Sequence, residues 1–138
     1  MNIPLNGIYA YTHWQRPPMF LFYVDSNPLI TSWLREQALV GGDKFYSLTT
    51  LKESGYFLFD LKPDVLVVDS EILKNEKEHL LNAQASYDGL FAIPLVTVGR
   101  ESVEGNFGME FKGHIAKPIN PAQFFRQVRE LIGQTNLH

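Results

Sequence analysis

The chain has 138 residues, 45% of them hydrophobic and 20% charged, which is typical of one globular domain. A formal net charge of −3 gives no basic patch for nucleic acid, and the absence of cysteine excludes disulfides, thiolate metal sites and cysteine nucleophiles. No apolar run is long enough to cross a bilayer and the amino-terminal residues lack a secretory-signal pattern, so we expect a cytoplasmic protein that does not insert into membranes.

Residues 1–18 are expected to form an irregular extension, because Pro4, Gly7, Pro17 and Pro18 interrupt them and no hydrophobic period emerges. Regular patterning starts at residue 19. We therefore expect one domain over residues 19–133, followed by a short tail at residues 134–138.

The first elements of this domain are a strand, a helix and a second strand. Phe20–Val24 is a continuous apolar run, as in a central strand of a parallel sheet. Asn27 can cap a helix and Pro28 suits its first turn, while two glycines at residues 41–42 end it. Residues 44–48 predict the second strand.

A helix, a strand and a further helix follow. Residues 50–53 have the spacing of a capping box and predict that a second helix opens there and ends before Pro63. Val65–Val68 is β-branched and uncharged, which predicts a buried strand that runs into Asp69. The polar stretch through Ala85 is expected to be helical.

The last part of the chain predicts two strands and a closing helix. Residues 94–98 form the fourth strand and residues 114–116 the fifth. Residues 99–113 contain four glycines and little periodicity, so any helix there is expected to be short or irregular. An Asn-Pro pair at residues 120–121 begins the closing helix, and Gly133 ends it.

Five apolar strands alternating with helices predict an α/β fold, a doubly wound parallel sheet with helices on both faces. Ligands of such sheets bind at the carboxyl ends of the strands. The first strand ends in Asp25 and Ser26, the third in Asp69, the fourth in Thr97 and the fifth in Lys117. We expect these side chains to converge on one rim.

This combination suits the formation of an acyl phosphate, in which a carboxylate attacks a phosphoryl group and catalysis consists mainly of positioning and neutralising charge. Asp69 would attack. The ammonium of Lys117 and the hydroxyl of Thr97 would each hold a phosphoryl oxygen, and a magnesium ion held partly by Asp25 would hold the third.

The same residues resemble the response-regulator receiver family of two-component signalling, over nearly the whole of residues 19–133. The motifs in chain order are YVDSNP, VLVVDS, VTVGR and IAKPINP. The resemblance implies a flavodoxin-like sheet with strand order 2-1-3-4-5 and a cis peptide before Pro118. It also implies that Asp69 is the phosphoacceptor and that Thr97 and His114 form the switch.

For the metal, the resemblance implies magnesium bound by Asp25, Asp69 and the backbone carbonyl of Glu71. Ser26 stands where the family usually has the second acid, which contacts the metal directly. Its hydroxyl supplies no charge to a cation that dehydrates reluctantly, so we expect magnesium binding to be weak or absent.

The resemblance implies a histidine kinase or a phosphotransfer protein as the phosphoryl donor. A downstream protein would bind the face made by residues 99–113, the fifth strand and the closing helix, and the pattern is also compatible with a homodimer. A degenerate receiver that binds its partner without phosphorylation is the alternative.

An enzyme that turns over substrate is not expected. The haloacid-dehalogenase-like phosphatases also use an aspartate at a strand end, and residues 69–71 approximate their motif. These phosphatases, however, need another acidic motif well after the lysine, and only 21 residues follow Lys117.

Residues 41–45, GGDKF, resemble the diguanylate cyclase motif but fit a helix end and a strand better. A dinucleotide-binding glycine fingerprint is absent, and the four histidines lack metal-ligand spacing.

Overall fold

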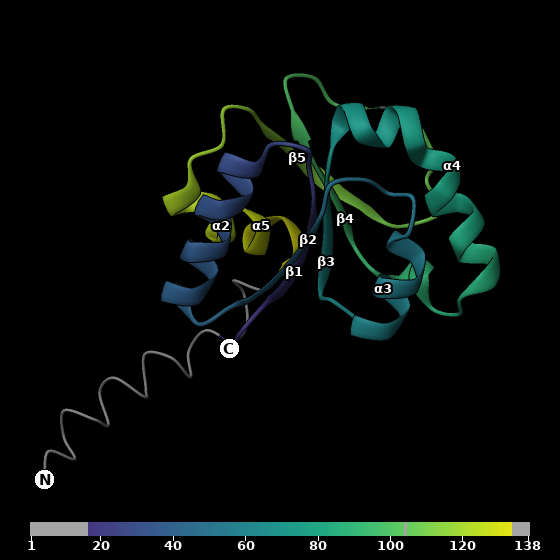
Figure 1. Ribbon diagram of the computed structural model, residues 1–138, viewed down its shortest axis with the longest axis horizontal. Helices are drawn as coiled ribbons and strands as arrows, with labels where there is room; N and C mark the ends of the chain where they lie inside the picture. The colour runs from purple at the N-terminus through teal and green to yellow at the C-terminus, as the bar shows by residue number, and fades with distance from the viewer. Residues whose placement is uncertain (1–16, 104, 134–138) are drawn as a thin grey trace, which may run out of the picture.

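The structure is a computed structural model and describes residues 17–103 and 105–133. At its centre lies a parallel sheet of five strands in the order β2-β1-β3-β4-β5, which confirms the predicted order. Figure 1 shows α2 and α5 on one side of the sheet and α3 and α4 on the other, so both faces are covered. The strands are β1 (Phe20–Val24), β2 (Lys44–Leu48), β3 (Val65–Asp69), β4 (Leu95–Gly99) and β5 (Phe111–Ala116).

Most helix ends follow the local signals of the sequence. Asn27 caps the first helix by accepting hydrogen bonds from two backbone N–H groups, and Asn120 caps the last one. Gly42 and Gly133 close these helices in the left-handed conformation, as predicted. The helices are α2 (Pro28–Gly41), α3 (Ser54–Leu61), α4 (Ser70–Ser86) and α5 (Pro121–Ile132), with a 3₁₀ turn η1 at Leu90–Ala92.

The core consists of two layers, because successive side chains of a strand point to opposite faces of the sheet. Each fully buried Val, Leu or Phe in these layers contributes about 1.5–3 kcal/mol. The layer under α2 and α5 includes Leu21, Tyr23, Val65, Val67, Val96, Val98, Phe124 and Val128. The layer under α3 and α4 includes Phe22, Val24, Leu66, Val68, Leu95, Leu58, Leu73 and Leu80.

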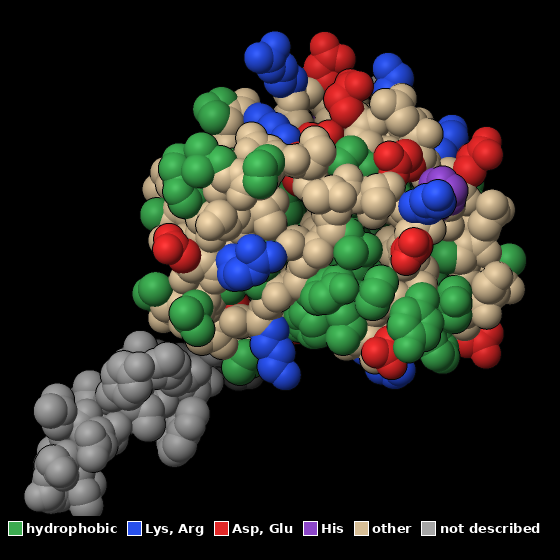
Figure 2. All heavy atoms as spheres, in the orientation of Figure 1, with side chains coloured by type: hydrophobic (Ala, Val, Ile, Leu, Met, Phe, Trp, Pro, Cys, Tyr) green, Lys and Arg blue, Asp and Glu red, His purple; other side chains and the backbone are tan. Residues whose placement is uncertain are grey.

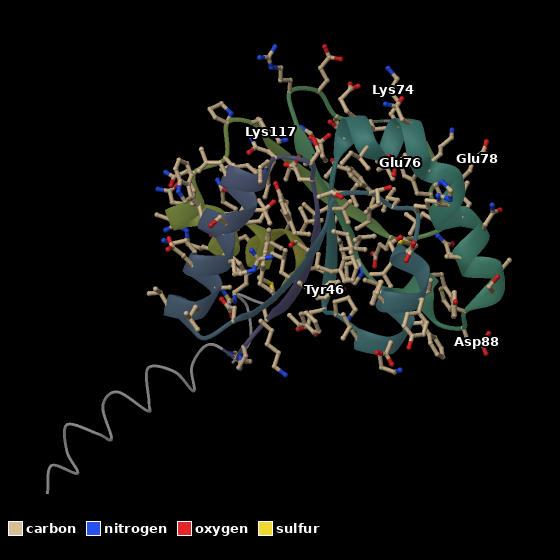
Figure 3. The ribbon with its side chains drawn as sticks, viewed as in Figure 1. Tyr46, Lys74, Glu76, Glu78, Asp88 and Lys117 are labelled. Atoms are coloured by element: carbon tan, nitrogen blue, oxygen red, sulfur yellow. The ribbon has the colours of Figure 1, made fainter. Side chains whose placement is uncertain are left out.

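The predicted capping box at residues 50–53 is wrong. Helix α3 begins only at Ser54, and the side chain of its N-cap residue, Glu53, makes no capping hydrogen bond. The hydroxyl of Thr50 instead donates to Oε1 of Glu76 (2.6 Å), which also accepts from the N–H of Leu51 (2.8 Å). Glu76, labelled on α4 in Figure 3, has non-helical backbone angles, so its carboxylate joins a kink of α4 to the turn before α3.

Between β4 and β5 the described residues, 100–103 and 105–110, form no α-helix, in line with the predicted irregular segment. The fifth strand begins earlier than predicted, at Phe111. The predicted extension and tail, apart from Pro17 and Pro18, lie outside the described residues. None of the described helices is long and apolar enough to span a membrane.

Figure 2 shows apolar side chains gathered over the lower part of the molecule, where β2 and α3 lie, and charged side chains along its top and over α4. Tyr46 of β2, labelled in Figure 3, lies in this area; its ring centroid is 5.5 Å from that of Phe57 on α3, which also contacts the ring of Tyr56. Lys117, labelled in Figure 3, lies at this charged end together with its partners Asp25 and Asp69.

Candidate functional site

Three charged side chains meet at the carboxyl end of the sheet. The Nζ atom of Lys117 lies 2.9 Å from Oδ2 of Asp25 and 2.8 Å from Oδ1 of Asp69. Asp25 directly follows β1 and Asp69 ends the neighbouring strand β3, while Lys117, labelled in Figure 3, directly follows β5, on the other side of β4. The peptide before Pro118 is cis, as predicted. One ammonium thus bridges two carboxylates that come from distant parts of the chain.

Asp25 is held by several donors. Its side chain is 3% exposed, and its Oδ2 accepts from the Tyr23 hydroxyl at 2.7 Å as well as from Lys117. Its Oδ1 accepts from the N–H of Asn27 at 3.3 Å. Burial, and then the negative charge and the hydrogen bond of Asp25, raise the pKa of Tyr23 well above its usual value, so the phenol stays a donor.

Tyr23 is a site residue that the sequence analysis missed. The available signal was its spacing, since a residue two positions before Asp25 on the same strand shares its face of the sheet. The apolar run around Tyr23 made it read as core alone, and its ring is indeed fully buried.

Asp69 is both the last residue of β3 and the N-cap of α4. Its Oδ2 accepts from the N–H groups of Glu71 (3.1 Å) and Ile72 (3.3 Å), which leaves Oδ1 directed at Lys117. A helical carbonyl points toward the carboxyl end of its helix, whereas Asp69 lies at the amino end of α4. The implied use of the Glu71 carbonyl as a metal ligand therefore does not fit this helix, in which Glu71 contributes its N–H.

Lys117 remains a cation beside Asp69. Burial of its ammonium lowers the pKa of Lys117, but the hydrogen bonds and charges of Asp69 and Asp25 raise it more, so this pKa lies above its ordinary value. Its side chain is 27% exposed, which leaves access for a small anion. A fixed cation next to a carboxylate is the arrangement that stabilises charge developing on a transferred phosphoryl group.

The prediction that Thr97 ends its strand is wrong, because β4 continues to Gly99. Thr97 is fully buried opposite His114 of β5, and its Oγ1 lies 2.7 Å from Nδ1 of His114. Nε2 of His114 lies 2.9 Å from the carbonyl of Gly99, which can only accept, so Nε2 carries the hydrogen. In neutral His114 the Thr97 hydroxyl then donates to Nδ1.

The two implied switch residues are thus in contact with each other. Among the described residues, however, neither Thr97 nor His114 forms a hydrogen bond with Asp69 or Lys117. The end of strand β4 was predicted at Thr97, two residues before its actual end at Gly99. The reason is that the apolar run stops at Val98, and the glycine after it signals a turn as readily as a strand.

Gly99 occupies the end of β4 because no side chain fits there. Its φ is +154°, which favours glycine, and a Cβ atom on it would lie 2.0 Å from Oγ of Ser70. The first residue of α4 therefore fills the space beside the strand end, next to Asp69. Ser70 was not among the receiver site residues predicted from the sequence.

Asp25 and Asp69 provide two carboxylates for a magnesium ion, and two suffice in sites where water and phosphate oxygens complete the coordination. The donor set therefore fits this ion, although Ser26 is exposed and adds no charge. Among the described residues, no group of three or more histidines and acids is arranged to hold a metal. A metal here would rest on these two aspartates.

Searches of protein-family models and of curated proteins found no match. Solved structures do match. Chemotaxis response regulator CheY4 of Vibrio cholerae has 15% sequence identity and a TM-score of 0.67, covering 83% of this chain and 99% of that one. A two-component response regulator from Clostridium difficile has 14% identity and a TM-score of 0.64, with coverage of 86% and 99%.

A third similar structure is the receiver domain of a sensor histidine kinase from Pseudomonas aeruginosa, with a magnesium ion coordinated in its active-site cleft. It has 12% identity and a TM-score of 0.65, and covers 85% of this chain and 99% of that one. Each of these three structures is covered over 99% of its length, and the strand order of this chain is that of a flavodoxin-like sheet. The chain therefore has the flavodoxin-like fold of response-regulator receiver domains.

Proposed function

We propose that this chain is a receiver domain of a two-component phosphorelay, which accepts a phosphoryl group on Asp69 and signals through contact with another protein in the cytoplasm. The observation that carries the proposal is the contact of Asp69 Oδ1 with the ammonium of Lys117 at 2.8 Å, at the carboxyl end of a receiver-like sheet. It is a regulatory module and not a turnover enzyme.

The two oxygens of Asp69 have different roles in this proposal. Oδ1 attacks the phosphorus of a phosphohistidine on a histidine kinase or phosphotransfer protein, and the P–N bond breaks as the O–P bond forms. Oδ2 becomes the carbonyl of the acyl phosphate and keeps its bonds to the N–H groups of Glu71 and Ile72. Lys117 moves from Oδ1 to a phosphoryl oxygen, and the leaving imidazole takes up a proton.

A magnesium ion, when bound by Asp25 and Asp69, would neutralise charge on the phosphoryl oxygens. Tyr23 and Asn27 hold the Asp25 carboxylate in place through their hydrogen bonds, within the group of Asp25, Asp69 and Lys117 that we call the pocket. Because Ser26 adds no negative charge, the free pocket relies on Lys117 as its counter-ion, and we expect weak magnesium affinity.

A second candidate function is a degenerate receiver that binds its partner without phosphorylation. The lack of an acid at Ser26 and the engagement of both aspartates by Lys117 favour it. The partner would bind on the side of β5 and α5, where Pro118, Gln127 and Leu131 line a groove that also includes His114. The same groove would serve as the output face, or as a homodimer contact, of a phosphorylated receiver.

Phosphorylation by a small-molecule donor separates the two candidates. After incubation with phosphoramidate and magnesium, intact-mass spectrometry should find one added phosphoryl group in the wild type and none in Asp69→Asn. Asp60→Asn, which alters an exposed carboxylate of α3, is the matched control and should be modified like the wild type. If the wild type takes up no phosphoryl group at saturating donor, the phosphorylation-independent module is the better account.

A further inference from the structure

Ser70 presents an unused hydroxyl at the pocket. It directly follows Asp69, it is 5% exposed, and its Oγ forms no hydrogen bond with any other described residue. Nearly buried hydroxyls normally have a partner, and where the protein supplies none, water or a ligand does. The N–H groups of Glu71 and Ile72 at this end of α4 already donate to Asp69 itself, so they do not compete with the hydroxyl as donors there.

The packing at Gly99 fixes where this hydroxyl lies. A Cβ atom on Gly99 would come within 2.0 Å of Oγ and 3.2 Å of Cβ of Ser70, so the serine side chain sits over the end of β4. The carbonyl of the same glycine accepts the N–H of Lys117 at 3.0 Å. Ser70 therefore follows Asp69 in the chain and packs against Gly99, whose carbonyl binds the backbone N–H of Lys117.

Thr97, to which the family resemblance gives the hydroxyl role, is engaged elsewhere. It lies two residues before the end of β4, is fully buried, and its Oγ1 is hydrogen-bonded to His114. To reach an anion on Asp69 it would have to leave that partner, whereas the hydroxyl of Ser70 has no hydrogen-bond partner to leave within residues 17–103 and 105–133.

We propose that Ser70 Oγ, held over Gly99 beside Asp69, donates a hydrogen bond to an oxygen of the oxyanion carried by Asp69. This inference rests on the proposed function and deepens it, since it names the residue that recognises the phosphoryl group together with Lys117. Lys117 supplies charge, while the serine hydroxyl supplies a directed donor on the side of β4. In the free protein, water satisfies the hydroxyl and the anion replaces that water.

The test is the affinity for beryllofluoride, a phosphoryl mimic, measured by ¹⁵N–¹H NMR titration of the full chain in magnesium. Ser70→Ala should weaken binding about tenfold or more, the value of a lost hydrogen bond to a charged group. Thr97→Val, which removes the other hydroxyl, should change the affinity by less than about threefold. Thermal unfolding checks that both variants are folded. Asp69→Asn gives the baseline of the titration.

The outcomes of this titration distinguish the inference about Ser70 from the proposed function. Equal affinities of Ser70→Ala and the wild type would overturn this inference and leave the proposed function intact. A larger loss in Thr97→Val than in Ser70→Ala would return the role to the threonine. No saturable binding by the wild type would overturn the proposed function and this inference with it.

Discussion

The bridge formed by Lys117 between two aspartates makes a quantitative prediction for Lys117→Met, which keeps an unbranched side chain and removes the charge. The two carboxylate oxygens lie within 3 Å of the same nitrogen, so they are less than about 6 Å apart, and at an effective dielectric constant of about 20 their repulsion is about 3 kcal/mol. Asp25 is almost fully buried and cannot recover this through water. We expect Lys117→Met to lower the free energy of unfolding by about 3 kcal/mol at neutral pH.

Urea unfolding at neutral pH and at about pH 5 is the assay. Protonation of one carboxylate removes the repulsion in the folded variant. As the pH falls, the folded variant therefore binds more protons than its unfolded chain does. The deficit should therefore shrink as the pH falls, and millimolar magnesium should also reduce it by taking the place of the ammonium. Lys52→Met, at an exposed lysine, is the matched control and should change stability by less than about 0.5 kcal/mol. A loss in Lys117→Met no larger than in this control, and independent of pH, would refute the electrostatic reasoning.

Three further predictions concern neighbouring residues. Ser26→Asp should raise magnesium affinity at least about tenfold, measured by calorimetry, since it adds the missing anionic ligand; unchanged affinity would mean that the pocket is not a metal site. Stability should fall above about pH 10, because unfolded chains lose the protons of Tyr23 and Lys117 at their ordinary pKa values while the folded pKa of each is raised; Tyr23→Phe should flatten this fall, and an unaltered slope would contradict the role of that phenol. Gly99→Ala should cost about 2–3 kcal/mol in thermal or urea unfolding through its clash with Ser70, and Ser70→Ala should recover part of the loss; a neutral Gly99→Ala would show that the two residues are not packed together.

The fold was predictable from the sequence because its signals are local. An apolar run gave the bounds of β1, and asparagine-proline pairs gave the starts of α2 and α5. Alternation of strands and helices then left few topologies, and handedness reduced them further. Asp25, Asp69 and Lys117 were identified for the same reason, since each stands where an apolar strand stops.

The rest of the site depends on contacts between elements, which no local pattern encodes. Thr97 was assigned to the strand end because Gly99 looks like a turn residue, whereas pairing of Gly99 with Ala116 of β5 continues the strand. The capping box before α3 failed because Glu76, from the kink of α4, takes the Thr50 hydroxyl. Tyr23 is an exception: it reads as core because of the apolar run around it, although its spacing of two residues from Asp25 was a local signal that the two share a face of the sheet.

The most direct test of the central claim is a crystal structure of the protein with magnesium and beryllofluoride. The account predicts beryllium bonded to Oδ1 of Asp69, the ammonium of Lys117 on one fluorine, and Oδ2 still hydrogen-bonded to the N–H groups of Glu71 and Ile72. A pocket without the anion at saturating concentration, with Lys117 still between the carboxylates of Asp25 and Asp69, would contradict it.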